Sequence, residues 1–105
     1  MFQKIIQVLE DNGKGIHGYR KCAEAAYASI ADAPELASAY YLLASEAESF
    51  IDFNERMPMN ITDTATAFEQ FSVNAKQLGK AFSSGTAEQK LAAINAVAMR
   101  LNKTT

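Results

Sequence analysis

The sequence lacks tryptophan and holds only one cysteine, one histidine and two prolines. A single cysteine cannot form an intramolecular disulfide, so the cysteine content does not indicate a redox compartment. Without tryptophan, the four tyrosines and six phenylalanines must supply the bulky packing. No apolar run approaches the roughly 18 residues that would indicate a membrane span. We therefore expect no membrane-spanning segment.

The sequence also lacks any basic run or basic face, and its formal net charge is −2. Nucleic-acid-binding domains carry a clustered basic surface, so we expect no nucleic-acid partner. The segment Met1–Glu10 is too short and too amphipathic for a signal peptide. By elimination, we expect a cytoplasmic protein.

What is present is typical of an all-α domain. The 105 residues fit one domain, 1–105, and 49% of them are hydrophobic, which is enough for a core. Ala, Glu, Lys, Gln and Leu dominate, and no segment shows the alternation of a strand. The expected helices lie at about 2–30, 34–57, 62–82 and 87–101. Such a small domain is marginally stable, and self-association is a common remedy.

The first helix is the ambiguous one. Residues 11–15 have the composition of a turn. The apolar spacing nevertheless continues through them at about 100° per residue. We therefore predict one long helix from Phe2 to Ile30, kinked near Gly13, and two shorter helices joined by a turn are the alternative. The face predicted for the long helix comprises Phe2, Ile5, Ile6, Leu9, Gly13, Ile16, Ala23, Tyr27 and Ile30.

The later helices have clearer ends. Proline is tolerated in the first turn of a helix, so Pro34 indicates a helix start. The residue before a proline avoids the helical conformation, so Pro58 indicates a helix end. Thr86 and Gln89 have the spacing of a capping box after Gly85. The link Met57–Asn60 is short, and short links join antiparallel neighbours. These features predict an antiparallel four-helix bundle.

Three segments carry a family resemblance. They are Leu9–Gly13 with Gly18–Ala26, the joint Asp32-Ala33-Pro34-Glu35-Leu36, and Leu43–Phe50. Together they resemble a family of bacterial proteins with no assigned biochemistry, grouped with the ferritin-like four-helix bundles. The match covers residues 4–56, about half the chain. The resemblance implies a ferritin-like fold, but that family has a longer connection between its second and third helices. A short link favours a simple up-down-up-down order instead.

A ferritin-like fold raises the question of a metal site. Such sites combine two glutamates with two Glu-x-x-His pairs. The only histidine is His17 and no Glu-x-x-His occurs, so this ligand set is excluded. A carboxylate-only site for a divalent metal such as iron is the alternative, and otherwise no cofactor is expected. The candidate ligands of this carboxylate-only site are Glu24, Glu46, Asp11 and Asp52. Glu24 and Glu46 are expected to face each other across the pair formed by the first two helices.

Two further readings concern single residues. His17, with Arg20 one turn later, permits histidine phosphotransfer, although the fuller signature of such domains, with Lys-Gly and small residues after the histidine, is absent. Cys22 lies beside Lys21, which can lower a thiol pKa, but no catalytic partner is evident. A buried, inert cysteine is the simpler interpretation. No catalytic residue is predicted, and we do not expect an enzyme.

A second apolar patch on the expected helix 34–57 suggests a protein partner. Tyr41 falls off the main apolar face, and Leu42, Ala44 and Ile51 lie near it. A second patch on a small bundle indicates association. Our leading hypothesis is a non-enzymatic bundle that forms a homodimer or binds another protein through Tyr41, Leu42 and Ile51. Metal or small-ligand binding through bundle carboxylates is the alternative hypothesis, and phosphotransfer through His17 is a minor one.

Overall fold

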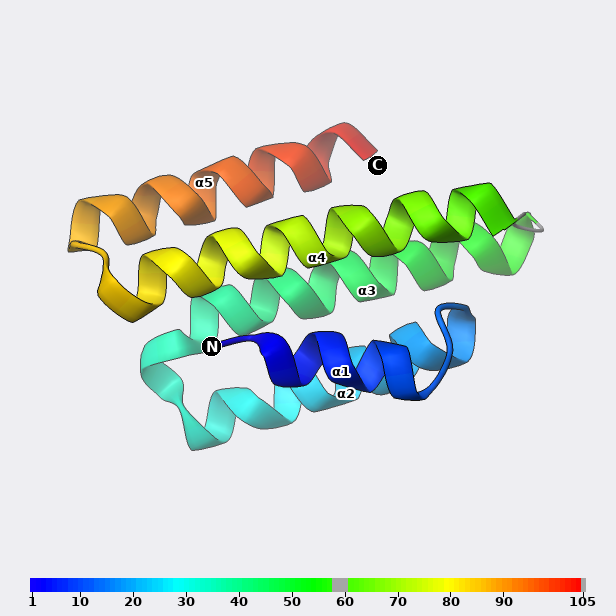
Figure 1. Ribbon diagram of the computed structural model, residues 1–105, viewed down its shortest axis with the longest axis horizontal. Coiled ribbons are helices and arrows are strands. Elements are labelled where there is room, and N and C mark those ends of the chain that lie inside the picture. The colour runs from blue at the N-terminus through cyan, green and yellow to red at the C-terminus, as the bar shows by residue number, and fades with distance from the viewer. Residues whose placement is uncertain (58–60, 105) are drawn as a thin grey trace.

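The computed structural model describes residues 1–57 and 61–104, and within these residues the protein is all-helical, with no strand. It has five α-helices and one 3₁₀ turn in this part of the chain (Figure 1). In chain order these are α1 (Gln3–Asp11), α2 (Ile16–Asp32), η1 (Pro34–Leu36), α3 (Ala37–Arg56), α4 (Ile61–Ser84) and α5 (Ala87–Thr104).

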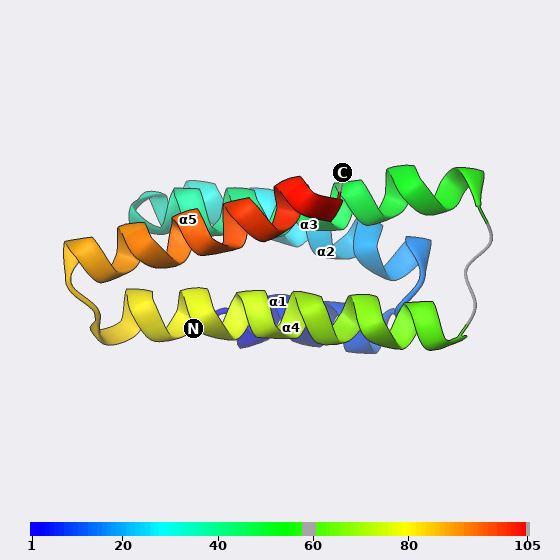
Figure 2. The ribbon, with the colours of Figure 1, turned by 90° about the horizontal axis from the view of Figure 1, so that it is seen from above.

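Each helix runs antiparallel to the one before it, and the helices form two layers (Figure 2). One layer holds α1 and α4, and the other holds α2, α3 and α5. Contacts within the layers join α1 to α4, α2 to α3 and α3 to α5, while α1–α2, α3–α4 and α4–α5 contacts join the two layers. The molecule measures 41 × 27 × 17 Å. The α2–α3 contact is the most extensive one.

The prediction of one helix from Phe2 to Ile30 is wrong. The chain leaves the helix after Asp11, and Gly13 has a φ of +80°, a conformation that glycine adopts without steric cost. The helix α2 then folds back along α1. The two-helix alternative therefore describes the structure, and residues 1–57 and 61–104 form five α-helices rather than four.

The buried face of α2 differs from the face that the continuous apolar spacing predicted. In α1, Phe2, Ile5, Ile6 and Leu9 are buried as predicted. In α2 the buried face is different, and Tyr27 is 39% exposed. That buried face comprises Gly18, Tyr19, Cys22, Ala23 and Ala26.

The other helices lie close to their predicted positions, with some differences in what they bury. In α3, Ala39, Leu43 and Ala47 are buried, whereas Met57, just beyond the helix, is 57% exposed. In α5, Val97 is fully buried and Leu91 is 58% exposed. The predicted effect of Pro58 and most of the link Met57–Asn60 lie outside the described residues.

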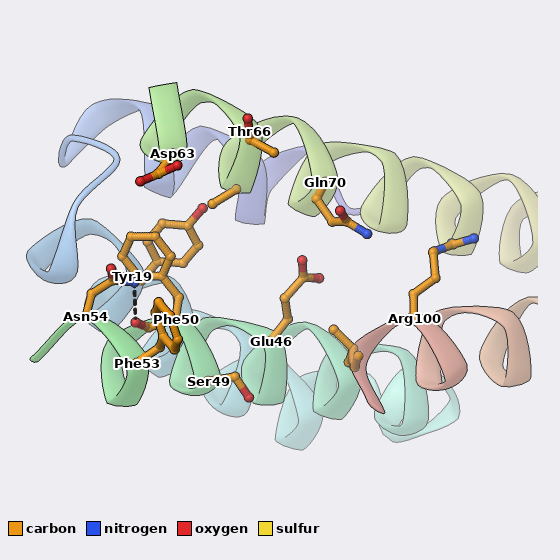
Figure 3. A pocket seen from close by; sticks show the side chains of 12 residues that line it. Tyr19, Glu46, Ser49, Phe50, Phe53, Asn54, Asp63, Thr66, Gln70 and Arg100 are labelled. Carbon is orange, nitrogen blue, oxygen red and sulfur yellow. Dashed lines mark hydrogen bonds between the residues drawn. The ribbon is translucent and has the colours of Figure 1, made fainter. Parts of the chain in front are cut away.

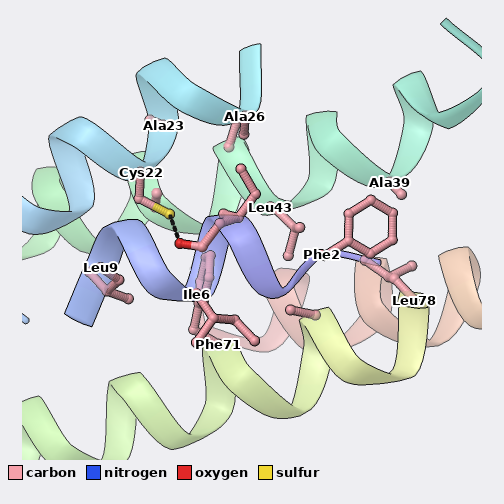
Figure 4. Close-up of a cluster of buried hydrophobic side chains, with 14 of the residues drawn as sticks. Phe2, Ile6, Leu9, Cys22, Ala23, Ala26, Ala39, Leu43, Phe71 and Leu78 are labelled. Carbon is pink, nitrogen blue, oxygen red and sulfur yellow. Dashed lines mark hydrogen bonds between the residues drawn. The ribbon is translucent and has the colours of Figure 1, made fainter. Parts of the chain in front are cut away.

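A single hydrophobic cluster unites the five helices (Figure 4). Leu9 of α1, Leu43 of α3 and Phe71 of α4 are fully buried in it, and Val97 contributes from α5. Phe2 packs edge-on against Tyr40 at 5.0 Å and against Phe82 at 6.3 Å between ring centroids. Cys22 donates from Sγ to the carbonyl oxygen of Ile5 at 3.8 Å, which ties α2 to α1.

Candidate functional site

A cavity of about 340 Å³ opens where α5 ends against α3 and α4 (Figure 3). Figure 1 shows that α5 covers only part of the length of α3 and α4, so these two helices continue beyond it. Residues from α2, α3, α4 and α5 line the cavity. They are Tyr19, Glu46, Ser49, Phe50, Phe53, Asn54, Asp63, Thr66, Ala67, Gln70, Arg100 and Leu101.

A chain of hydrogen bonds holds Glu46 at the cavity wall. Asn74, which is fully buried, donates from Nδ2 to Glu46 Oε1 at 2.9 Å. Arg100 donates from Nε to Asn74 Oδ1 at 2.9 Å, and it also donates to Gln77 Oε1. Because arginine has only donors, the Asn74 oxygen must face Arg100 and its NH₂ group must face Glu46. Glu46 Oε1 is therefore a hydrogen-bond acceptor.

The environment of Glu46 brings its proton equilibrium close to neutral pH. Burial raises the pKa of this carboxyl from 4.5 to about 7, because the charged form loses hydration. The Asn74 hydrogen bond and the positive charge of Arg100 act in the opposite direction and offset part of this effect. Strongly perturbed carboxyls in cavities are a frequent property of functional sites.

The aromatic side chains gather at one end of the cavity. Tyr19 stacks on Phe50 with 3.8 Å between ring centroids, and Phe71 packs edge-on against it at 5.9 Å. Tyr19 is 1% exposed, and its hydroxyl makes no hydrogen bond with the described residues. Burial, and next the charge of Glu46, raises the pKa of this phenol, so it stays protonated. Phe53 is 62% exposed at the cavity mouth.

The four candidate metal ligands do not converge. Asp11 is exposed at the end of α1 and accepts a hydrogen bond from Gln7 at 2.8 Å. Glu24 and Asp52 line one surface depression between α2 and α3, and Glu24 lies 3.7 Å from Lys21. Glu46 instead faces α4 through Asn74. The structure thus brings Glu24 near Asp52 but does not pair Glu24 with Glu46.

The residues present do not fit the metal centre that a ferritin-like fold implies. Within residues 1–57 and 61–104, no group of three or more His, Cys, Asp and Glu side chains could hold a metal ion. The carboxylate of Glu46 has an amide neighbour rather than a second carboxylate. No metal chemistry is derived for this site.

The proposed interface residues are only partly at the surface. Tyr41 is 57% exposed and lies edge-on to Tyr27, with 6.2 Å between ring centroids. Leu42 and Ile51 are partly buried and pack against the core of the same chain, and Ala44 is fully buried. The reason is that α3 contacts α2, α4 and α5, so more than one of its faces is covered.

The histidine considered for phosphotransfer lies on the surface. His17 is exposed in the first turn of α2. Arg20 reaches across to α3, where its guanidinium lies 3.4 Å from the Glu55 carboxylate. Cys22 lies apart from the cavity lining, and burial raises the pKa of its thiol to about 12.

The cavity lining and the hydrogen bonds behind it include residues that were not predicted from the sequence. Glu46 was identified, but Tyr19, Asn74 and Arg100 were not. Asn74 offered a signal, because it falls on the same face of α4 as Phe71 and Leu78, and a polar residue at a buried position requires a partner. Nothing in the local spacing could have found Arg100, which meets Asn74 only through the packing of α5.

Comparison of the chain with protein-family models, with curated proteins and with solved structures finds no match. Among the described residues, no helix has both the length and the apolar character needed to cross a lipid bilayer.

Proposed function

We propose that this protein binds a small organic molecule in the cavity between α3, α4 and α5. One observation carries the proposal: Tyr19, whose buried hydroxyl has no hydrogen-bond partner among the described residues, lines the same cavity as Glu46, whose carboxylate accepts a hydrogen bond from Asn74. An unpaired buried polar group costs about 1–3 kcal/mol, which a ligand with a matching group would recover.

The composition and size of the cavity also support binding. Ligand sites are commonly about 300–1,000 Å³, largely apolar, with a few polar groups that fix orientation. This cavity, at about 340 Å³, has an aromatic end at Tyr19 and Phe50 and a polar wall at Glu46. The one cysteine lies elsewhere, under α1. We therefore propose binding rather than covalent catalysis.

A cavity-filling variant tests this proposal. A library of small aromatic and aliphatic fragments is added to ¹⁵N-labelled protein, and amide chemical shifts are recorded. We expect some fragments to bind and to change the amide chemical shifts of Glu46, Ala67 and Arg100 most strongly. Ala67→Leu, which places a larger side chain in the cavity, should remove them. The matched control is Ala65→Leu, because Ala65 is exposed on the same helix and does not line the cavity. Binding that survives Ala67→Leu would place the ligand elsewhere.

The resemblance to ferritin-like proteins, in our proposal, concerns the bundle and not a metal centre. The contacts among α1, α2, α3 and α4 form a closed ring, as expected for an antiparallel four-helix bundle, and α5 packs on its α3–α4 side. Metal analysis of protein purified without chelator tests this. We expect no stoichiometric iron, manganese or zinc, and a bound equivalent lost in Glu46→Ala would contradict the proposal.

Self-association is a second candidate function. It is favoured by the edge-on pair of Tyr27 and Tyr41, two exposed aromatic residues on neighbouring helices. Sedimentation equilibrium of the parent and of Tyr41→Ser measures it. A dimer that the substitution weakens would support association at this surface, and a monomer at high micromolar concentration would exclude it.

A further inference from the structure

The charged residues that line the cavity are Glu46, Asp63 and Arg100. Figure 3 shows the side chain of Glu46 directed from α3 into the space between α3 and α4. Arg100 also lines the cavity, but its guanidinium turns away toward Asn74 and Gln77, which accept its hydrogen bonds. The hydrogen bonds of Arg100 are thus made within the wall, and Glu46 is the carboxyl group directed into the space.

The aromatic rings favour the same kind of ligand. The faces of aromatic rings attract cations, because the π-electron density makes each face partly negative. Phe53 lines the cavity and is exposed, while Phe50 and Tyr19 lie stacked at the end opposite Arg100 (Figure 3). A ligand with an apolar body and a positive group would contact both the rings and the carboxylate.

We propose that the cavity takes a small organic cation, a protonated amine whose ammonium group binds Glu46 and whose apolar body packs against Phe50 and Phe53. This inference rests on the proposed function and specifies its ligand class. An ammonium group has only donors, and Glu46, with Oε1 already accepting from Asn74, retains free acceptor capacity on its second oxygen. The hydroxyl of Tyr19 remains for a second polar group of the ligand.

Ligand charge should couple to the proton of Glu46. The titratable and charged groups around this carboxyl are Arg100 on α5, Tyr19 and Cys22 on α2, and Asp63 on α4. A bound cation favours the ionised carboxylate, so the amine should displace a proton from Glu46. Affinity for the amine should therefore rise from pH 6 to pH 8, whereas affinity for a neutral molecule of the same shape should not.

Three probes with a matched phenyl body test the ligand class. They are 2-phenylethylamine, which is a cation, 2-phenylethanol, which is neutral, and 3-phenylpropionate, which is an anion. Titrations at pH 8 are followed by isothermal calorimetry or amide chemical shifts. We expect the amine to bind about tenfold tighter than the alcohol, in line with one charge-assisted hydrogen bond in a sheltered site. The anion should bind most weakly.

Two variants test whether Glu46 causes the preference for the amine over the alcohol. Glu46→Gln should remove the preference, so that the amine and the alcohol bind with equal affinity. The circular dichroism spectrum and the urea unfolding midpoint of the variant show separately that it is folded. Glu24→Gln removes the same charge from an exposed site outside the cavity and should preserve the preference.

Each other outcome contradicts a defined part of the proposal. Equal binding of amine and alcohol, or tighter binding of the anion, would overturn the cation class while leaving small-molecule binding intact. Failure of all three probes at millimolar concentration would also overturn the cation class. The fragment screen with Ala67→Leu and Ala65→Leu would then decide separately whether the cavity binds any molecule.

Discussion

Gly18 and Gly79 are both buried helical glycines, yet their surroundings differ sharply. A Cβ atom at Gly18 would lie 1.7 Å from the carbonyl oxygen of Gly13, in the turn between α1 and α2. A Cβ atom at Gly79 would meet its nearest neighbour, a ring carbon of Phe2, at 3.7 Å, an ordinary contact. Only at Gly18 does the close approach of another backbone segment exclude a side chain.

Substitution by alanine should separate the two positions. Gly18→Ala should destabilise the fold by about 1–3 kcal/mol or more, because the Gly13 turn must move. Gly79→Ala should be neutral or stabilising by up to about 1 kcal/mol, since alanine is the better helix former. Urea unfolding of both variants measures the difference. Equal stability of the two would mean that the turn does not pack against Gly18.

At the scale of elements, the capping box predicted for α5 is confirmed. Gln89 N–H donates to Thr86 Oγ1 at 3.2 Å, and Thr86 N–H donates to Gln89 Oε1 at 2.8 Å. These two bonds satisfy amide groups that the first turn of a helix otherwise leaves without partners.

Removal of this cap should weaken α5. Thr86→Ala should cost about 1 kcal/mol of stability, the usual effect of losing an N-cap side chain. Thr86→Ser keeps the hydroxyl and is the matched control, with an expected change of a few tenths of a kcal/mol. Thermal or urea unfolding provides the measurement. A Thr86→Ala variant as stable as the serine variant would show that the box contributes nothing to the fold.

The sequence predicted the helices that have clear local ends. Pro34 and the box at Thr86 mark boundaries by their own backbone chemistry, so α3 and α5 begin near their predicted residues. The break at Gly13 was missed because the apolar residues on either side happened to continue one spacing. Both α1 and α2 bury one face in the same core. When the apolar residues of two such helices happen to keep a helical spacing across the turn, the sequence resembles that of one long helix.

The candidate site could be predicted only in part, for a similar reason. Glu46 was identified from its place at the edge of an apolar face. Its partners Asn74 and Arg100 lie on two other helices, and their meeting depends on how α4 and α5 pack. The spacing of apolar residues predicts which face of each helix is buried. It does not predict the distance or the relative rotation of two packed helices, so the cavity between them could not be predicted.

At the scale of the whole molecule, Glu46 should make stability depend on pH. Its pKa is about 7 in the folded protein and near 4.5 in the unfolded chain, so the folded state binds this proton more tightly. The stabilisation from this group is then fully present below about pH 4.5 and is lost as pH rises through 7. A shift of this size corresponds to about 3 kcal/mol.

Glu46→Gln isolates this contribution. The glutamine carbonyl can still accept from Asn74, and no proton is exchanged. We expect the free energy of unfolding of the parent to fall between pH 5 and pH 8 relative to that of Glu46→Gln, and the variant to be the more stable protein at pH 8. Urea unfolding at several pH values checks this, with Glu24→Gln as the control that keeps the parent slope. A parallel pH dependence in parent and Glu46→Gln would contradict the burial of this charge.

The fold-back at Gly13 also bears on how the chain acquires its structure during synthesis. With only nine residues, α1 is too short to be stable alone, because isolated helices need about 12–15 residues. It completes its packing only against α4, where Phe2 meets Phe82. A ribosome makes α1 before α2, α3 and α4. During synthesis α1 can therefore pack on α2 and α3 first, and the part of its apolar face that contacts α4 is covered only after α4 has emerged.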